Sequence, residues 1–366
     1  MRWSKERIWT WYNGRPWIRG CNYMSYDCAN RIDQWQNLGS EKRFEIVEDE
    51  LKLMQETGYN TVRLILEYVV WKEEHDSFME RFERYLALYS KYGISCMIVL
   101  ANDCMPPKTD DWKLPYIGEQ EFNWGYQFNR KRSQHGHHSV AAPHFYLDDP
   151  VTREDYYCMV REIVTKYKND KRICIWDIYN EPGNSGRGEI SFPVLKEMFA
   201  LVRDIDPIQP LTCAIWSFSS DERVPYSPMD RFILDNSDVI SYHSYSIYTE
   251  SIKQIRRLKL EGRPIINSEW LARCIYNNVQ EMFPLFYLEN VGCLNWGFVT
   301  GRSQTTEPWE YLLDDYDKGI TSIDMTKWFH DLYRGSHRPY DPQEIAIIKD
   351  FCALADRDFA EKQKVN

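Results

Sequence analysis

The sequence predicts an α/β fold, a single (β/α)8 barrel of the TIM type spanning residues 1–366 as one domain. Short apolar segments alternate with segments of helical periodicity along most of the chain, which is typical of barrel and doubly wound folds. No break in composition divides the chain. No glycine-rich phosphate loop follows the first predicted strand, which disfavours a doubly wound open sheet.

Eight segments have the length and apolar character of buried strands. They are residues 17–22, 60–66, 94–100, 172–179, 211–215, 239–243, 264–268 and 291–296. Helical periodicity is predicted over residues 44–57, 77–92, 152–168, 192–205, 250–260, 279–288 and 342–355. Gly58 and Gly93 mark the ends of the first two helices, and Thr152 is the predicted N-cap of the third.

Two connections are too long for simple barrel loops. Residues 101–150 follow the third strand, and residues 298–340 follow the eighth. Long ordered loops on a barrel are usually functional, and these two leave its C-terminal face, where barrel active sites lie. We therefore expect them to shape the site.

Composition limits the partners. The formal net charge of -10 disfavours nucleic acid and anionic membrane as partners, and no apolar run is long enough to predict a membrane span. The aromatic content of 15% fits either a large core or a sugar-binding cleft, because a pyranose face stacks on aromatic rings. Oligomeric state stays open.

The N-terminal residues and the cysteines predict a cytoplasmic protein. Residues 1–7 contain no apolar segment of the kind found in export signals. The ten cysteines show no framework spacing and no C-x-x-C pair, and several lie in predicted strands. Reduced, buried thiols in a reducing compartment are the simplest interpretation.

Two glutamates follow predicted strands. Glu181 ends the segment Cys174–Glu181, and Glu269 ends the segment Pro264–Glu269. The ends of the fourth and seventh strands can face each other across a barrel mouth, so the two carboxylates can meet there. Such a pair can supply the proton donor and the nucleophile of glycoside hydrolysis. Either residue alone could simply cap a helix or pair with an arginine.

The order of motifs resembles the clan of retaining (β/α)8 glycoside hydrolases that includes family 5. The motifs are Asn180-Glu181-Pro182, His243-Ser244-Tyr245, Ser268-Glu269, Arg63 in the second strand and Trp296 after the eighth. The resemblance spans nearly the whole chain. It implies that Glu181 is the acid/base and Glu269 the nucleophile.

The same resemblance implies roles for the substrate-binding residues. Arg63 would keep the nucleophile ionised, and Tyr245 would hydrogen-bond it. His243 would contact the acid/base or the substrate, Asn180 a sugar hydroxyl, and Trp296 the sugar face in the −1 subsite. From the residues alone, His243 and Tyr245 could be a structural pair and Trp296 a core residue.

One segment departs from the family pattern. Family 5 proteins often carry a histidine after the third strand, where this chain has Asn102-Asp103-Cys104. We expect Asn102 and Asp103 to line the −1 pocket and bind sugar hydroxyls instead. Together with Asn22 and Trp35, this departure indicates a divergent subgroup of the cellulase, mannanase and β-mannosidase type.

We expect neither a metal nor a cofactor. The run Gln134-His135-Gly136-His137-His138 contains metal-ligand residue types, but a flexible loop does not guarantee the converging geometry of a zinc site. No G-x-S-x-G, Walker or H-E-x-x-H motif is present, so serine esterase, nucleotide hydrolase and zincin chemistry lack support.

The sequence therefore predicts a retaining β-glycosidase acting by double displacement. Glu181 needs a raised pKa for this role, and Glu269 a low one. We expect exo action on an oligosaccharide or small β-glycoside, β-linked and gluco- or manno-configured. An endo-acting cellulase, mannanase or xylanase, a transglycosylase and a non-catalytic carbohydrate-binding barrel are the alternatives.

Overall fold

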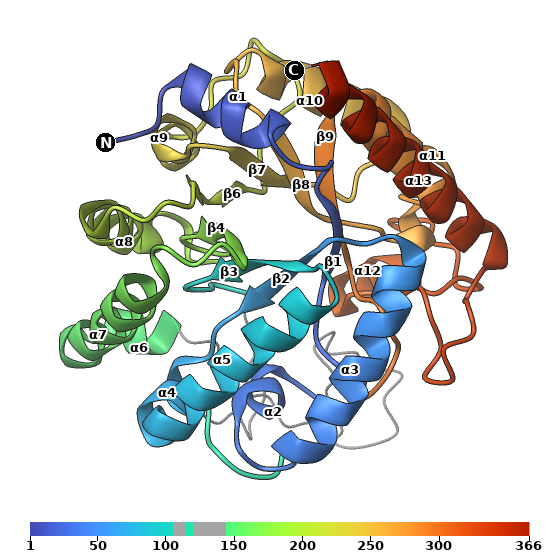
Figure 1. The fold of residues 1–366 in the computed structure, drawn as a ribbon. Coiled ribbons are helices and arrows are strands. Elements are labelled where there is room, and N and C mark those ends of the chain that lie inside the picture. Colours follow the sequence, from blue (N-terminus) through green and yellow to red (C-terminus); the bar gives the residue numbers. More distant parts are fainter. Residues whose placement is uncertain (105–113, 121–143, 366) are drawn as a thin grey trace.

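Parallel strands form one sheet that rolls into a barrel in the computed structural model, which describes residues 1–104, 114–120 and 144–365 (Figure 1). The sheet order is β5-β4-β3-β2-β1-β9-β8-β7-β6. The strands are β1 (Arg19–Asn22), β2 (Thr61–Ile65), β3 (Ser95–Val99), β4 (Ile173–Asp177), β5 (Leu211–Thr212), β6 (Ala214–Ile215), β7 (Ile240–His243), β8 (Ile265–Trp270) and β9 (Val291–Trp296). The predicted barrel fold is confirmed.

The barrel closes at its fifth strand. The predicted strand 211–215 is divided at Cys213 into β5 and β6. β5 pairs with β4, and β6 pairs with β7, so the two halves join the ends of the sheet. Because β5 and β6 together form the fifth barrel strand, β8 and β9 are the seventh and eighth barrel strands.

Helices surround the sheet (Figure 1). They are α1 (Lys5–Asn13), α2 (Arg31–Trp35), α3 (Ser40–Thr57), α4 (Tyr68–Glu73), α5 (His75–Lys91), α6 (His144–Asp148), α7 (Pro150–Tyr167), α8 (Phe192–Ile205), α9 (Pro228–Asn236), α10 (Tyr248–Lys259), α11 (Val279–Leu288), α12 (Glu310–Asp317) and α13 (Pro342–Val365). Short 3₁₀ turns cover Gly188–Ser191 and Arg273–Ile275. The seven predicted helices are all present.

Helix ends follow their local chemistry. Gly58 ends α3 in a left-handed conformation at φ 92°, and its N–H bonds carbonyl groups of the last turn. The predicted N-cap Thr152 is wrong. Asp149 caps α7, because its carboxylate accepts the Thr152 N–H and Pro150 begins the helix.

Helix α1 seals one end of the barrel. Its apolar face, with Trp3 just before it, packs against inward-facing residues from most of the strands. This buried cluster comprises Trp3, Ile8, Tyr12, Ile18, Met97, Cys174, Ile175, Val239, Ile266 and Leu294. Ile18 and Val239 directly precede β1 and β7, and Ile266 is the second residue of β8, so the cluster lies towards the N-terminal end of the barrel and leaves the C-terminal end for the site.

We predict that Ile8→Ala lowers the free energy of unfolding by about 2–5 kcal/mol, because Ile8 is fully buried in this cluster. The exposed Thr10 on the same helix is the matched control, and Thr10→Ala should change stability by less than about 0.5 kcal/mol. Urea unfolding measures both. Equal effects of the two substitutions would show that α1 does not seal the barrel.

Candidate active site

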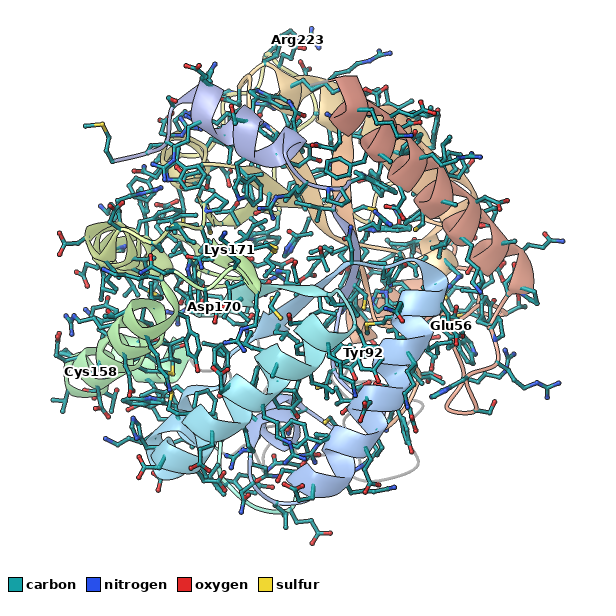
Figure 2. All side chains as sticks on the ribbon, viewed as in Figure 1. Glu56, Tyr92, Cys158, Asp170, Lys171 and Arg223 are labelled. Carbon is teal, nitrogen blue, oxygen red and sulfur yellow. The ribbon has the colours of Figure 1, made fainter. Side chains whose placement is uncertain are left out.

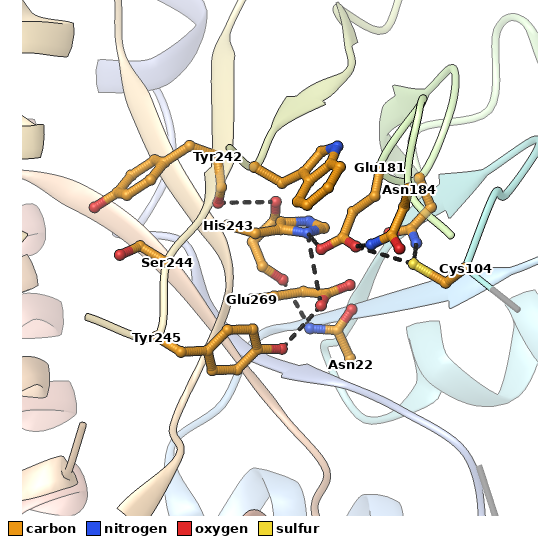
Figure 3. Close-up of polar contacts among 12 residues, drawn as sticks. Asn22, Cys104, Glu181, Asn184, Tyr242, His243, Ser244, Tyr245 and Glu269 are labelled. Atoms are coloured by element: carbon orange, nitrogen blue, oxygen red, sulfur yellow. Dashed lines mark hydrogen bonds and ion pairs between the residues drawn. The ribbon is translucent and has the colours of Figure 1, made fainter. Parts of the chain in front are cut away.

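Glu181 and Glu269 meet at the C-terminal end of the barrel, as predicted (Figure 3). One oxygen of each carboxylate and a ring nitrogen of His243 lie within 4.8 Å of one another. Both glutamates are largely buried, at 8% and 7% exposure. This close approach fits the separation of about 5–5.5 Å in retaining glycosidases better than the 6.5–9.5 Å of inverting ones.

An irregularity in β8 aims Glu269 into the barrel. Ile266 already faces the interior, and strict alternation would turn a residue three positions later outward. The pairing of β8 shifts register with β7 and again with β9 at this point. Trp270 consequently packs outward against Phe283 and Phe286 of α11, and Glu269 faces the site.

Arg63 is the central cation of the site. It is 1% exposed on β2, and its Nη1 donates to Glu269 Oε1 at 2.7 Å. Its Nη2 and Nε both donate to Asp177 Oδ2, at 2.8 and 3.0 Å. The side-chain oxygens of Asn22 and Asn180 accept from the same guanidinium. The predicted contact between Arg63 and the nucleophile candidate is confirmed.

Tyr245 and His243 each contact one carboxylate. The Tyr245 hydroxyl donates to Glu269 Oε2 at 2.9 Å, and His243 Nδ1 lies 2.6 Å from Glu181 Oε1. Burial, followed by the negative charge of Glu269, raises the pKa of Tyr245 and keeps its proton available for this bond. Both contacts agree with the roles that the family resemblance implies.

Glu181 lies in a turn that departs from ordinary backbone geometry. Its φ is 46°, in the left-handed region that non-glycine residues rarely adopt. Besides His243, its carboxylate accepts from Cys104 Sγ at 2.9 Å and from Asn184 Nδ2 (Figure 3). The strained turn thus places the carboxylate among several donors.

These donors reverse the expected direction of the Glu181 pKa. Burial raises it, but hydrogen bonds from His243, Cys104 and Asn184 outweigh burial and lower the pKa below its ordinary value. The expectation of a raised pKa considered only burial and the neighbouring carboxylate. It did not include the donors, because Cys104 and Asn184 are not recognisable as site residues from the sequence.

Asn180 and Asn102 form a buried pair beneath the site. Asn180 Nδ2 donates to Asn102 Oδ1 at 2.7 Å, and the two residues also pair through the backbone between the ends of β3 and β4. Asn102 is fully buried, and its amide donates to the Cys104 carbonyl. Asn102 therefore supports Asn180 and the turn at Cys104, which corrects its prediction as a pocket-lining residue.

The prediction for Asp103 is also corrected. Asp103 is fully buried and anchors the loop that carries Glu181. Its carboxylate accepts from the Tyr179 hydroxyl, the Gly183 N–H and the Ser191 hydroxyl, and it pairs with Arg187 at 2.9 Å. A carboxylate satisfied on all sides does not face an open pocket, because burial demands that its oxygens be paired within the fold.

Trp296 ends β9 and lines a pocket beside the carboxylates. It is 9% exposed and meets the ring of His330 edge to face. The pocket is lined by Asn22, Tyr23, Met24, Arg31, Gln34, Arg63, Ile65 and Trp296. Its role as a sugar-stacking residue stays a prediction.

The site also contains residues that the sequence analysis did not assign. Asp177 is the most important, because it shares Arg63 with Glu269. A charged residue in the apolar run Ile173–Asp177 is a recognisable signal, since such a residue needs a buried partner. Cys104, Asn184 and Asn22 carry no comparable signal, since their roles depend on three-dimensional proximity alone.

Part of the loop after β9 packs against the site. Trp309 contacts Tyr245 edge to face and stacks on Tyr311, which is 58% exposed. This supports the prediction that this long connection shapes the site. The tract 134–138 lies outside the described residues.

Among the described residues, Glu181, His243 and Glu269 are the only group of at least three residues whose ligand atoms converge as in a metal site. The ten cysteines, all within the described residues, form no disulfide with one another. In the described part of the chain, no helix is long and apolar enough to cross a membrane.

The fold and the paired carboxylates define a glycoside hydrolase of the retaining barrel type. The family model for cellulase, glycosyl hydrolase family 5, matches residues 27–297. The chain therefore belongs to glycosyl hydrolase family 5, which confirms the resemblance.

Solved structures share this fold. An endo-β-1,4-mannanase from Thermotoga petrophila superposes with a TM-score of 0.55 at 16% identity, covering 94% of this chain and 78% of that one. An exo-β-1,4-mannosidase from Opitutaceae bacterium strain TAV5 gives 0.56 at 14%, covering 94% and 60%. A family 5 mannosidase from Rhizomucor miehei gives 0.54 at 14%, covering 94% of each.

A curated relative matches part of the chain. A β-glucuronidase from Chlorocebus aethiops is 27% identical over 157 residues, which are 41% of this chain. The match spans only 23% of the relative's own length. It therefore concerns part of that protein.

We predict that Asp103→Ala lowers the free energy of unfolding by about 3–5 kcal/mol, because the Arg187 guanidinium, the Gly183 N–H and the buried hydroxyls of Tyr179 and Ser191 lose their partner. Asp148 pairs with the same Arg187 but is 41% exposed, so Asp148→Ala should cost no more than about 1 kcal/mol. Urea unfolding of both variants provides the comparison. If Asp103→Ala lowers the free energy of unfolding only slightly, Asp103 does not anchor the loop, and the original prediction that it lines the pocket holds.

Proposed function

We propose that the protein removes a sugar from the non-reducing end of short β-linked, gluco- or manno-configured oligosaccharides, with retention of configuration. Glu181 protonates the glycosidic oxygen while Glu269 attacks the anomeric carbon. A glycosyl-enzyme forms on Glu269. Glu181, now a base, activates the water that releases the sugar.

The observation that carries the exo proposal is a wall of hydrogen-bonded loops beside the site. Residues 115–120, from the connection after β3, bond to the chain around α2. Gly118 N–H donates to Gln36 Oε1, and Gln36 Nε2 donates back to the Gly118 carbonyl, both at 2.8 Å. Asn30 Nδ2 donates to Gln120 Oε1 at 2.9 Å.

The loop after β9 joins the same wall. Arg302 donates to the carbonyl groups of Gln120 and Asp27, at 2.8 and 3.2 Å. Three connections, those after β1, β3 and β9, are thus tied together. An endo enzyme needs an open cleft on both sides of the scissile bond, whereas a wall on one side favours a chain end.

These hydrogen-bonded loops lie on the side of the site that would hold the glycone, the sugar that forms the bond to the enzyme. The leaving group must lie beside Glu181, which protonates it, so the retained sugar lies towards Glu269, Arg63 and Trp296. The pocket on this side is backed by Arg31 and Gln34 of α2. A closed end on this side would stop a longer chain beyond the retained sugar.

Polar atoms suited to sugar hydroxyls belong to Gln34, which lines this pocket, and to Glu67, which pairs with the lining residue Arg31. Gln34 Nε2 and Glu67 Oε1 are buried and have no hydrogen-bond partner among the described residues. Glu67 lies 3.7 Å from Arg31, and burial raises its pKa to about 7 in spite of that cation. A hydroxyl group both donates and accepts, so a sugar could satisfy both atoms.

The comparisons support the substrate class without choosing the mode of attack. Both endo-mannanases and exo-mannosidases are among the similar structures. An endo-acting enzyme is therefore the second candidate. A non-catalytic barrel is disfavoured because both carboxylates and their supporting donors are in place.

A screen of aryl β-glycosides tests the function. We expect turnover of the β-mannoside or β-glucoside that is abolished in Glu269→Gln, because the amide is a poor nucleophile, and retained in the exposed control Glu80→Gln. The β-galactoside, β-xyloside and β-glucuronide complete the set. Matching oligosaccharides should yield monosaccharide alone. A rapid fall in the viscosity of a β-mannan or β-glucan would instead establish endo action.

The lowered pKa of Glu181 generates a pH prediction. Glu181 must be protonated to act as the acid, so the alkaline limb of kcat/KM follows its pKa. Removing one donor in Asn184→Ala should raise that pKa and move the limb to higher pH by about one unit. Asn236→Ala, which removes an amide bonded to Phe232 in α9, is the control. A limb that stays in place or moves to lower pH would contradict the assignment.

A further inference from the structure

Two aromatic side chains that the hydrolytic steps do not use lie at the C-terminal end of the barrel, on the side of Glu181. The first, Trp216, directly follows β6 and is partly exposed. Ile215 pairs with Tyr242 in the parallel register of β6 and β7. The next residue along, Trp216, therefore lies at the level of His243, whose Nδ1 contacts Glu181.

A hydrogen bond joins Trp216 to the loop that carries Glu181. The indole Nε1 donates to the carbonyl of Pro182 at 3.1 Å, and Pro182 is the residue directly after Glu181. This bond uses the only polar group of the indole, so the rest of the ring is an apolar surface. Because Trp216 is only partly buried, some of that surface is open to solvent beside the acid/base candidate.

The second side chain is Tyr311 of α12. Its ring stacks on Trp309, with centroids 5.7 Å apart and planes inclined by 17°. One ring face is thus covered, and because Tyr311 is 58% exposed, the other face is open. Trp309 contacts Tyr245 edge to face at 4.8 Å, and Tyr245 donates to Glu269. A row of rings therefore connects the nucleophile candidate with the exposed Tyr311.

Helix α12 holds Tyr311 away from the apolar cluster beneath the helix. The next two residues, Leu312 and Leu313, are buried in that cluster with Phe329. Successive helix residues are about 100° apart around the axis, so Tyr311 lies on a different face. Burial, followed by the negative charge of Glu181, raises the pKa of Tyr311 to about 12. Its hydroxyl end is therefore directed to the Glu181 side of the barrel mouth.

The leaving group has to lie on this side. Glu181 can protonate the glycosidic oxygen only within hydrogen-bond reach, so the first sugar of the leaving group must lie beside Glu181. A pyranose has an apolar face of C–H groups that packs on an aromatic ring, while its hydroxyl groups stay in water. Two partly exposed rings suit such a face better than they suit a charged or short alkyl group.

We propose that Trp216 and Tyr311 form the subsite for the first sugar of the leaving group, and that the natural substrate carries a pyranose there. The proposal rests on the proposed function, because it takes Glu181 as the acid. It adds the chemistry of the leaving side, which the two carboxylates do not determine. Trp216 is the main contact, since it is joined to the loop of the acid itself.

Calorimetric titration of the Glu269→Gln protein with cellotriose and mannotriose measures this subsite without turnover. We expect the trisaccharide that binds to bind at least about tenfold more weakly when Trp216→Ala is added, because tryptophans are among the side chains that contribute most to binding. Tyr311→Ala should weaken binding in the same direction. Unchanged affinity in both folded alanine variants would overturn the proposal.

Tyr92→Ala is the matched control for Tyr311→Ala and should bind as the parent protein does. Tyr92 is partly exposed and lies between α5 and β3, at the end of the barrel away from the carboxylates (Figure 2). Trp216→Phe separates stacking from the bond to Pro182, because phenylalanine keeps a ring but has no N–H. It should bind within about threefold of the parent. A loss as large as in Trp216→Ala would show a structural role only.

Kinetics of proteins with Glu269 intact give a second reading. The matching β-glycosyl fluoride has a single atom as its leaving group, so Trp216→Ala and Tyr311→Ala should leave its kcat/KM within about twofold. The kcat/KM for the trisaccharide should fall at least about tenfold in Trp216→Ala. Equal losses on both substrates would overturn the proposal, because the rings would then act on the acid/base and not on the leaving sugar.

Failure of the subsite and failure of the proposed function give different results. If the protein does not hydrolyse either trisaccharide but the alanine variants weaken binding, the subsite stands and the proposed function fails. If hydrolysis proceeds and the variants bind and react as the parent does, the proposed function stands and the subsite fails.

Discussion

The buried guanidinium of Arg63 is the interaction on which the active site depends. It links β2 to the ends of β4 and β8 by pairing with Asp177 and Glu269, and it orders Asn22 and Asn180 as well. A cation buried without partners would be very unfavourable, and so would two carboxylates brought together without it. Each buried charge therefore requires its opposite charges nearby, and this requirement determines the geometry of the barrel mouth.

The two glutamates are held by different means. Glu269 belongs to a strand, and its direction comes from a register irregularity within the sheet. Glu181 belongs to a loop, whose course depends on the buried carboxylate of Asp103. The nucleophile candidate is thus as rigid as the barrel, whereas the acid/base candidate is only as rigid as that loop. This arrangement suits a group that has to serve as acid and then as base.

Much of this architecture could be predicted from the sequence, because strands and helices follow local patterns of apolar residues. The same patterns located Glu181, Glu269 and Arg63, since each stands at or within a strand whose direction is fixed by the barrel. Asn102 and Asp103 were placed in the pocket because they stand where family 5 proteins often carry a histidine. The burial of Asp103 depends on partners such as Tyr179, Arg187 and Ser191, and that of Asn102 on Asn180, which all lie about 75 or more residues away. Cys104 was missed for the same reason, and Asn184 because the sequence does not show where a side chain of a loop points.

The seal formed by α1 also determines when the molecule can be completed. Its cluster needs side chains from strands spread along the chain, and Tyr12 bonds to the carbonyl of Asn290. Arg19 pairs with Asp356 across 337 positions of sequence. Contacts of such long range form slowly, because the intervening chain must first be ordered. During synthesis, α1 therefore cannot pack until nearly the last strand has been made. The barrel cannot fold one repeat at a time as it leaves the ribosome.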